Sequence, residues 1–344
     1  MSAFVLGFVW DNLTLTAIDR LFDDLILLSY LIAAFACIVL RSAHGARNFQ
    51  NSLAKRGVNF SEFLLPFSFG GLFSGFLIFY SRSGPVLASA PFLLLLSALF
   101  IGNEFFHKHY QRLIFQMSVF FVTLFSFVVL ITPILIGRMG DLVFILSGAI
   151  TLFLFWLALK ALSRVARDEM ERSRHALFAI VISIFAAFNF LYFNNMIPPI
   201  PLSLKEIGVY HRVERAKDGE YRLAFEKAPW YAWGRKTSAV FHRNGNEPIY
   251  VWSSVFAPTR LLTDILHQWA YFDEQKNEWI PSTVVSFPIS GGRGNGFRGY
   301  SKKEMVFPGK WRVDVETLRG QIIGRFVFEV VDAPAPPALK EEVR

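Results

Sequence analysis

A glycine-rich, basic stretch between residues 290 and 303 holds the side chains best suited to bind a ligand. It reads Ser-Gly-Gly-Arg-Gly-Asn-Gly-Phe-Arg-Gly-Tyr-Ser-Lys-Lys and contains no acidic residue. Glycines let a backbone approach a ligand closely, and cations suit an anionic ligand. The stretch lacks the Gly-Lys-Ser/Thr ending of a Walker loop. The predicted contacts are Arg293, Arg298, Lys302 and Lys303; the alternative is a flexible connection between two strands.

An aromatic cluster follows Pro229 in the sequence Pro-Trp-Tyr-Ala-Trp-Gly. Trp230 and Trp233 could stack on sugar rings, because their flat faces are large and rigid. The alternative is that these rings lie in a protein core or at a bilayer interface, where tryptophan is enriched. We include Trp230 and Trp233 among the predicted ligand-binding residues.

Glu104, His107, His109 and Arg112 form a polar group between two apolar runs. Such residues could bind a metal or a lipid-linked substrate, but no second Glu-x-x-His completes a two-metal site. We therefore predict a juxtamembrane loop and no metal. Cys37 is the only cysteine, which excludes a Cys-ligated zinc site and a disulfide within the chain.

The sequence contains no recognised catalytic motif. His211, His242 and His267 fall on predicted strands, and Ser253 falls on another. A Gly-x-Ser-x-Gly elbow, a His-Glu-x-x-His pair and a paired-acid motif are all absent. We predict structural histidines, no catalytic residue and no cofactor.

The first 200 residues are organised around six long apolar runs. A helix needs roughly 20 mostly apolar residues to cross the hydrocarbon of a bilayer. The runs span residues 25–40, 63–80, 85–102, 113–137, 142–162 and 176–196. Their centres contain no ionised side chain, which argues against a proton-coupled transporter. We predict a polytopic membrane domain of about six transmembrane helices, and a lipid bilayer as its surroundings.

The short loops alternate in charge. Basic residues gather after the first, third and fifth runs, and the opposite loops carry one basic residue each. Because basic loops remain in the cytoplasm, both the N-terminus and the chain after residue 196 are predicted on the outer side. Topology thus explains much of the net charge of +8, and we predict no nucleic-acid partner.

Composition changes near residue 198. We predict an interfacial segment over residues 1–24, the six-helix domain over 25–196 and a proline-rich linker over 197–204. Beyond the linker, charged residues reach the density of a soluble domain, and we predict an outer β domain over 205–332. Residues 333–344 combine three prolines with mixed charge, which predicts a disordered tail.

The second part of the chain alternates apolar and polar residues, as half-buried strands do. Asp218-Gly219, Asn244-Gly245 and Arg319-Gly320 each separate two such segments, and these dipeptides are typical of hairpin turns. Seven or eight short strands are expected. That number predicts an all-β, immunoglobulin-like sandwich without the disulfide.

Several segments resemble one bacterial family. They are His267-Gln-Trp269, Gly-Phe-Arg-Gly-Tyr-Ser301, Gly-Lys-Trp-Arg-Val-Asp-Val-Glu-Thr317 and Gly-Gln-Ile-Ile-Gly-Arg-Phe326. The region of about 262–331 is similar to the family known as domain of unknown function 2914. The proline-rich junction and the apolar runs look like those of its multi-span members. The resemblance implies a bacterial inner-membrane protein with an outer β domain, and it implies no activity.

The leading hypothesis is therefore a membrane-anchored binding module. Its outer β domain would engage an envelope glycan, an anionic lipid or a protein partner through the basic stretch and the two tryptophans. One alternative is a membrane enzyme or carrier for a lipid-linked substrate, built around Glu104, His107, His109 and Arg112. A third reading is a structural subunit of a larger complex.

Overall fold

The computed structural model describes residues 20–47, 52–105, 110, 112–217, 219–232, 235–291 and 296–344. The chain divides into two compact parts: residues 1–82 and 86–201 form one, and residues 202–344 with the short segment 83–85 form the other. We call these the helical unit and the β unit. The expected interfacial segment 1–24 lies almost wholly outside the described residues, and the first described helix already begins at Leu21.

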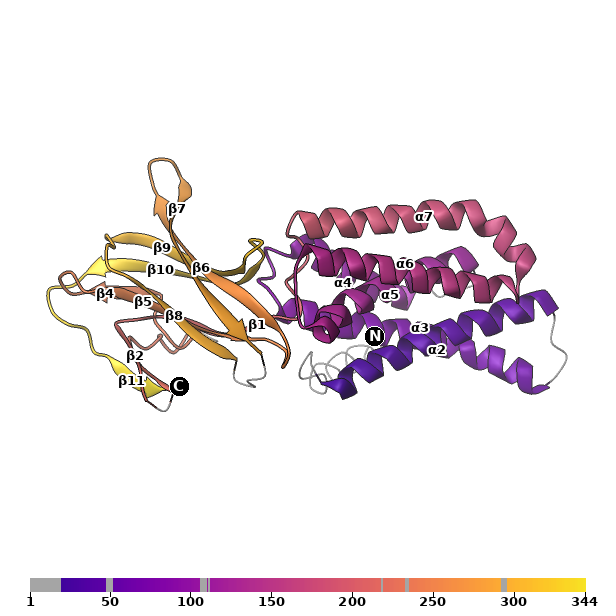
Figure 1. The fold of residues 1–344 in the computed structure, drawn as a ribbon, viewed down its shortest axis with the longest axis horizontal. Helices are drawn as coiled ribbons and strands as arrows, with labels where there is room; N and C mark the ends of the chain where they lie inside the picture. Colours follow the sequence, from indigo (N-terminus) through magenta and orange to yellow (C-terminus); the bar gives the residue numbers. More distant parts are fainter. Residues whose placement is uncertain are drawn as a thin grey trace. The chain divides into compact units, whose positions relative to one another are not determined.

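The helical unit contains six described helices that run side by side (Figure 1). Five are long and apolar enough to cross a membrane, and the short apolar α4 is the exception. With 16 residues, α4 is roughly 24 Å long, and Val86–Ser89 form a turn where the third apolar run was expected to be helical. The helices are α2 (Leu21–Arg47), α3 (Ser52–Arg82), α4 (Ala90–Phe105), α5 (Leu113–Ile136), α6 (Asp141–Ser163) and α7 (Arg167–Phe193).

Helix α5 forms the centre of this unit. In its most apolar stretch 78% of the residues are buried, against 17% for α7. The core is rich in phenylalanine, and Phe125 stacks on Phe188 with ring centroids 4.5 Å apart. The outer faces stay apolar and exposed, as at Leu142 and Phe178. Apolar side chains on outer faces are typical of helices that contact lipid.

A buried polar network joins three of the helices. Asn103 of α4 donates to the Pro66 carbonyl of α3 at 2.9 Å, and Tyr110 donates to the Asn103 side chain. Gln116 of α5 donates in turn to the Tyr110 carbonyl. Polar side chains inside an apolar bundle stabilise specific helix contacts when they are hydrogen-bonded in this way.

The β unit holds eleven strands within its described residues. They form a three-stranded sheet β1-β5-β8, a five-stranded sheet β4-β10-β9-β6-β7 and a three-stranded sheet β11-β3-β2. The strands are β1 (Ser203–Tyr210), β2 (Arg212–Arg215), β3 (Tyr221–Phe225), β4 (Val240–Arg243), β5 (Ile249–Phe256), β6 (Leu262–Asp273), β7 (Glu278–Ser290), β8 (Phe297–Lys303), β9 (Gly309–Thr317), β10 (Ile322–Asp332) and β11 (Lys340–Val343).

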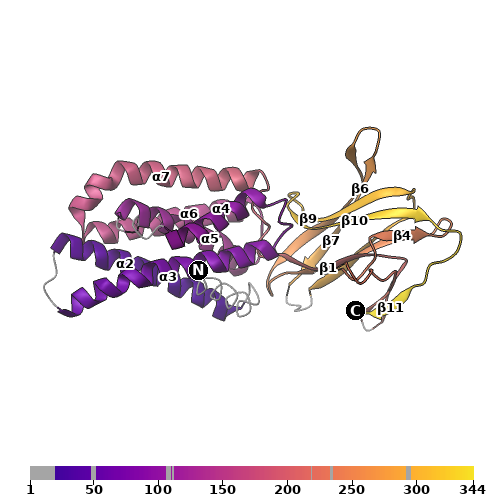
Figure 2. The ribbon, with the colours of Figure 1, turned by 180° about the vertical axis from the view of Figure 1, so that it is seen from behind.

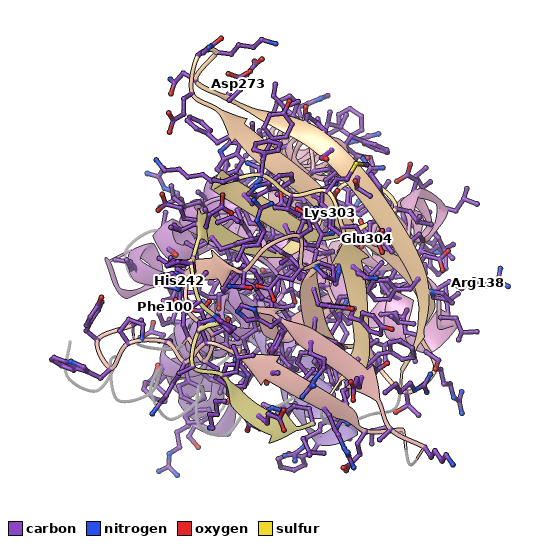
Figure 3. All side chains as sticks on the ribbon, turned by 90° about the vertical axis from the view of Figure 1, so that its left-hand side faces the viewer. Phe100, Arg138, His242, Asp273, Lys303 and Glu304 are labelled. Carbon is purple, nitrogen blue, oxygen red and sulfur yellow. The ribbon has the colours of Figure 1, made fainter. Side chains whose placement is uncertain are left out.

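The sheet β1-β5-β8 has a core on each face. Val251 packs toward Trp269 and Trp311 of the five-stranded sheet, whereas the next residue, Trp252, packs toward Leu223 of the third sheet. Because successive strand residues point to opposite faces, one apolar strand serves both cores. The β unit is therefore layered β-sheet. The tip of the β6–β7 hairpin, marked by Asp273, projects from it (Figures 2 and 3).

Two expectations for this unit were wrong. The Asn244-Gly245 turn is present, with Gly245 at φ +60°, but β4 pairs parallel with β10 and β5 pairs with β1 and β8. A turn signal sets the local backbone and does not choose the strand partner.

The C-terminal tail was expected to be disordered, and instead ends in strand β11. This strand pairs antiparallel with β3, whose free edge supplies backbone donors and acceptors. The mixed charges that suggested disorder form ion pairs in the structure: Glu341 pairs with Arg212, and Glu342 lies 2.8 Å from Arg344.

Candidate functional site

Strand β8 contains most of the described part of the predicted binding stretch. We expected the whole stretch 290–303 to be a loop or a flexible connection, but residues 297–303 form the edge strand of the sheet β1-β5-β8. Strand geometry sends alternate side chains to opposite faces. Arg298 and Lys302 therefore share one face with Tyr300, and Lys303 points to the other.

Tyrosines surround the first of these faces. Tyr250 of β5 is the cross-strand partner of Lys302, and its ring centroid lies 6.1 Å from that of Tyr300. Tyr221 of β3 lies 6.1 Å from Tyr300 and donates a long hydrogen bond of 3.5 Å to the Arg298 carbonyl. We call these five residues, Tyr221, Tyr250, Arg298, Tyr300 and Lys302, the tyrosine face. Tyr300 is 39% exposed, so the face is open to solvent.

The two cations of the tyrosine face differ in their contacts. Lys302 lies 2.7 Å from Glu304, and that hydrogen bond raises the pKa of the lysine. Both side chains are exposed, so the pair is weak and an incoming anion can replace it. Arg298 is half-buried, and its backbone carbonyl accepts from Tyr221. The face thus presents basic groups beside flat aromatic rings.

Lys303 belongs to a different environment. Its Nζ lies 2.6 Å from Thr283 Oγ1 and 5.6 Å from the centroid of the Trp311 ring. Burial lowers the pKa of Lys303. Figure 3 shows Lys303 and Glu304 on the same part of the β unit. Lys302 and Lys303 are adjacent in sequence, but they do not converge on one ligand.

The other predicted residues are only partly described. Arg293 and Trp233 lie outside the described residues. Trp230 is 91% exposed and meets Tyr231 edge to face, with centroids 6.0 Å apart. An exposed aromatic pair of this kind can contact a ligand or a bilayer surface. The structure gives it no contact with the tyrosine face.

Two of the glycines that suggested a binding loop have packing roles. A Cβ at Gly291 would lie 1.5 Å from the Pro258 carbonyl oxygen. Gly296 has φ +81°, and a Cβ there would lie 2.5 Å from Ser254 Oγ. Side chains are thus excluded at both positions by the backbone and by neighbouring atoms. Residues 292–295 lie between them, outside the described residues.

His267 is the centre of a buried polar network. Its Nε2 lies 2.8 Å from Ser253 Oγ, and its Nδ1 lies 2.9 Å from Ser301 Oγ, which also accepts from Trp269 Nε1 at 2.9 Å. Burial lowers the pKa of His267 to about 3, so its ring is neutral. The network has a serine–histidine pair but no carboxylate, and His267 and Ser253 are fully buried. It joins β5 and β8 to β6 and has a structural role.

A second histidine cluster unites four separate segments. Glu226 accepts from His211 Nε2 at 3.1 Å, from His242 Nδ1 at 2.6 Å and from the His242 backbone at 2.7 Å. Glu247 lies 3.3 Å from the other ring nitrogen of His211. Burial opposes ionisation of Glu226, but these hydrogen bonds outweigh it and lower the pKa. No sequence spacing indicated this cluster, because its members meet only through the fold.

The described residues include no group of His, Cys, Asp or Glu that could hold a metal ion. In the histidine–glutamate cluster the carboxylate oxygens already accept hydrogen bonds. The predicted polar group of the helical unit is largely outside the description: His107 and His109 are not described, and Arg112 is exposed before α5.

The fold defines a class of protein with an apolar helical unit followed by a layered β unit. Within the β unit, residues 262–330 match the family described as "Protein of unknown function (DUF2914)". This confirms the expected resemblance for the region from β6 to β10, which includes His267, Trp269 and Ser301 of the buried network but not Ser253. The matched stretch does not include the helical unit.

The comparisons with curated proteins and solved structures do not indicate a function for this chain. No curated protein matches the chain. Among solved structures, Pseudomonas fluorescens alkylpurine DNA glycosylase AlkC bound to DNA containing an abasic site analog aligns at 12% identity and a TM-score of 0.23. That alignment covers 92% of this chain and 99% of that one. A TM-score so low carries no argument about fold or function.

Proposed function

We propose that the protein is a membrane-anchored binding module of the bacterial inner membrane. The helical unit spans the bilayer, with the N-terminus and the β unit on the periplasmic side. The five long apolar helices support the membrane placement. The basic residues of alternate loops support the orientation, because such loops stay in the cytoplasm.

We propose an immunoglobulin-like sandwich as the frame of the β unit, with β2, β3 and β11 added as a further layer. The apolar core between the sheet β1-β5-β8 and the five-stranded sheet supports this description.

The ligand of the β unit is an acidic envelope glycan bound at the tyrosine face. One observation carries this proposal: Arg298 and Lys302 flank Tyr300 on the same side of an edge strand, next to Tyr250. Tyrosine rings contact sugar faces and donate hydrogen bonds, while the cations pair with acidic groups. An edge strand is also the part of a sheet most accessible to a partner.

Native mass spectrometry of the protein, extracted gently with its surrounding membrane, tests this function. The double variant Arg298→Ala/Lys302→Ala is compared with Lys276→Ala/Lys310→Ala, which removes the same charge elsewhere in the β unit. We expect a glycan adduct on the wild type and on the control, and its loss from the first variant. An adduct that survives in both variants would refute the assignment. Loss of a protein or lipid adduct instead would assign the tyrosine face to that class of partner.

A further inference from the structure

A pocket of about 650 Å³ lies between the end of α6 and the start of α7. In Figure 1 these two helices join at the right-hand side of the helical unit. Trp156, Leu159 and Lys160 line the pocket from α6, at the spacing of one helical face. Arg167, Met170 and Arg174 line it from α7 at the same kind of spacing. Two matched helical faces thus form its walls.

The pocket combines charged and apolar side chains. Trp156 lies seven residues before the end of α6 at Ser163, and Arg174 lies seven residues after the start of α7 at Arg167. At 1.5 Å per residue, both are roughly 10 Å from the turn that joins the helices. Leu159 and Met170 pack against the apolar core of the helical unit and form the floor. This arrangement matches the boundary between headgroups and hydrocarbon, where tryptophan is enriched.

The charge of the pocket is positive. Three cations and one acid line it, and the acid, Glu171, pairs with Arg167 at 3.0 Å on an exposed surface. Lys160 lies over the Trp156 ring, with its Nζ 4.9 Å from the centroid. Within the described chain, neither Lys160 nor Arg174 has a carboxylate partner. Two cations are therefore available to an anion at the level of Trp156.

We infer that this pocket binds one anionic phospholipid. Its phosphate lies between Lys160 and Arg174, and its acyl chains run along Trp156, Leu159 and Met170. Basic pockets between membrane helices are suited to anionic headgroups, and the volume falls within the usual range for small ligands. The apolar floor favours a lipid over free phosphate. The inference requires that the helical unit lies in a membrane, but is independent of the ligand of the β unit.

The test measures lipid retention by the full-length protein. Wild-type protein is reconstituted in nanodiscs that contain phosphatidylglycerol and phosphatidylcholine, released into mild detergent and analysed by native mass spectrometry. Lys160→Ala/Arg174→Ala is compared with Arg164→Ala/Arg172→Ala, which removes the same charge from the same region but from no residue of the pocket lining. Lys160→Gln/Arg174→Gln, which keeps more of each stem, serves as a second variant if the alanine variant does not fold.

We expect one phosphatidylglycerol per wild-type chain, retained in preference to phosphatidylcholine. The pocket variant should bind it about 30-fold more weakly, the factor expected for two basic residues beside an anionic headgroup, and the control should stay within about threefold. Equal retention of both lipids, or equal loss in both variants, would overturn the inference. Displacement of the lipid by millimolar inorganic phosphate would overturn it in favour of a free-phosphate site.

Discussion

Replacing Ser301 with alanine is expected to destabilise the β unit about twice as much as replacing Ser253 with alanine. Both serines are buried, and each contacts a ring nitrogen of His267. Ser301 has a second partner, because its Oγ also accepts from Trp269 Nε1. The two substitutions remove the same atom from similar environments and therefore differ mainly in the number of partners that they leave behind.

The magnitude follows from counting those partners. A buried polar group left without a hydrogen bond costs about 1–3 kcal/mol. Ser253→Ala leaves one such group, on His267, so the expected loss is about 1–3 kcal/mol. Ser301→Ala leaves two, the Trp269 Nε1–H and His267 Nδ1, so the expected loss is about 2–6 kcal/mol.

Hydrogen–deuterium exchange of the full-length protein in detergent measures both losses. Peptides from β6 report the free energy of local opening around His267. A loss of about 3 kcal/mol would speed their exchange by roughly 150-fold if exchange follows the opening equilibrium. Peptides from α5 provide the internal control and should be unaffected. A Ser301 variant that is no less stable than the Ser253 variant would refute the proposed network.

Three further predictions concern the β unit. Asp314→Ala should lower the free energy of unfolding, measured with a chemical denaturant, by about 2–4 kcal/mol. The reason is that Arg325 donates to both oxygens of this buried carboxylate, at 2.6 and 2.9 Å. An unchanged midpoint of the unfolding curve would contradict this. Gly291→Ala should lower the free energy of unfolding by at least about 3 kcal/mol in the same assay, since the new Cβ would overlap the Pro258 carbonyl. His267→Leu should flatten the pH dependence of stability. Burial lowers the pKa of His267 from 6.5 to about 3, so the unfolded chain takes up this proton first. Wild-type stability is thus complete above pH 6.5 and falls by about 1.4 kcal/mol per pH unit as the pH drops toward 3. A variant with the wild-type slope would contradict that assignment.

The helices could be predicted because their signal is local. An apolar run of about 20 residues predicts a membrane-length helix without knowledge of its neighbours. The prediction for the third apolar run, residues 85–102, was wrong at its start, because the run was counted from Pro85, whereas α4 begins at Ala90. A hydropathy pattern measures composition and does not locate the turn before the helix.

Strand partners were harder to predict than turns. The turn at Arg319-Gly320 joins the antiparallel pair β9 and β10 as expected, but the turn at Asn244-Gly245 joins strands of different sheets. Phe241 of β4 is buried beside Phe328 and Val330 of β10 in the apolar core. That long-range packing, which no local pattern contains, accompanies the parallel pairing of these two strands.

The sequence named two residues of the tyrosine face, Arg298 and Lys302, and whether they bind a ligand stays a prediction. The glycines of this stretch suggested a loop, whereas residues 297–303 form strand β8. The alternation Phe297, Gly299, Ser301 against Arg298, Tyr300, Lys302 was the signal that would have separated Lys302 from Lys303. Tyr221 and Tyr250 could not have been added, because they reach the face from other strands.

Photocrosslinking in intact cells tests the proposed role of the tyrosine face most directly. A photoreactive phenylalanine analogue is placed at position 300 and, as a control, at position 327; Tyr300 and Val327 are 39% and 37% exposed, and Val327 lies on the outer face of another sheet. Our account predicts a discrete glycan-bearing adduct from position 300 and none from position 327. No adduct at position 300, or the same adduct at both positions, would contradict it.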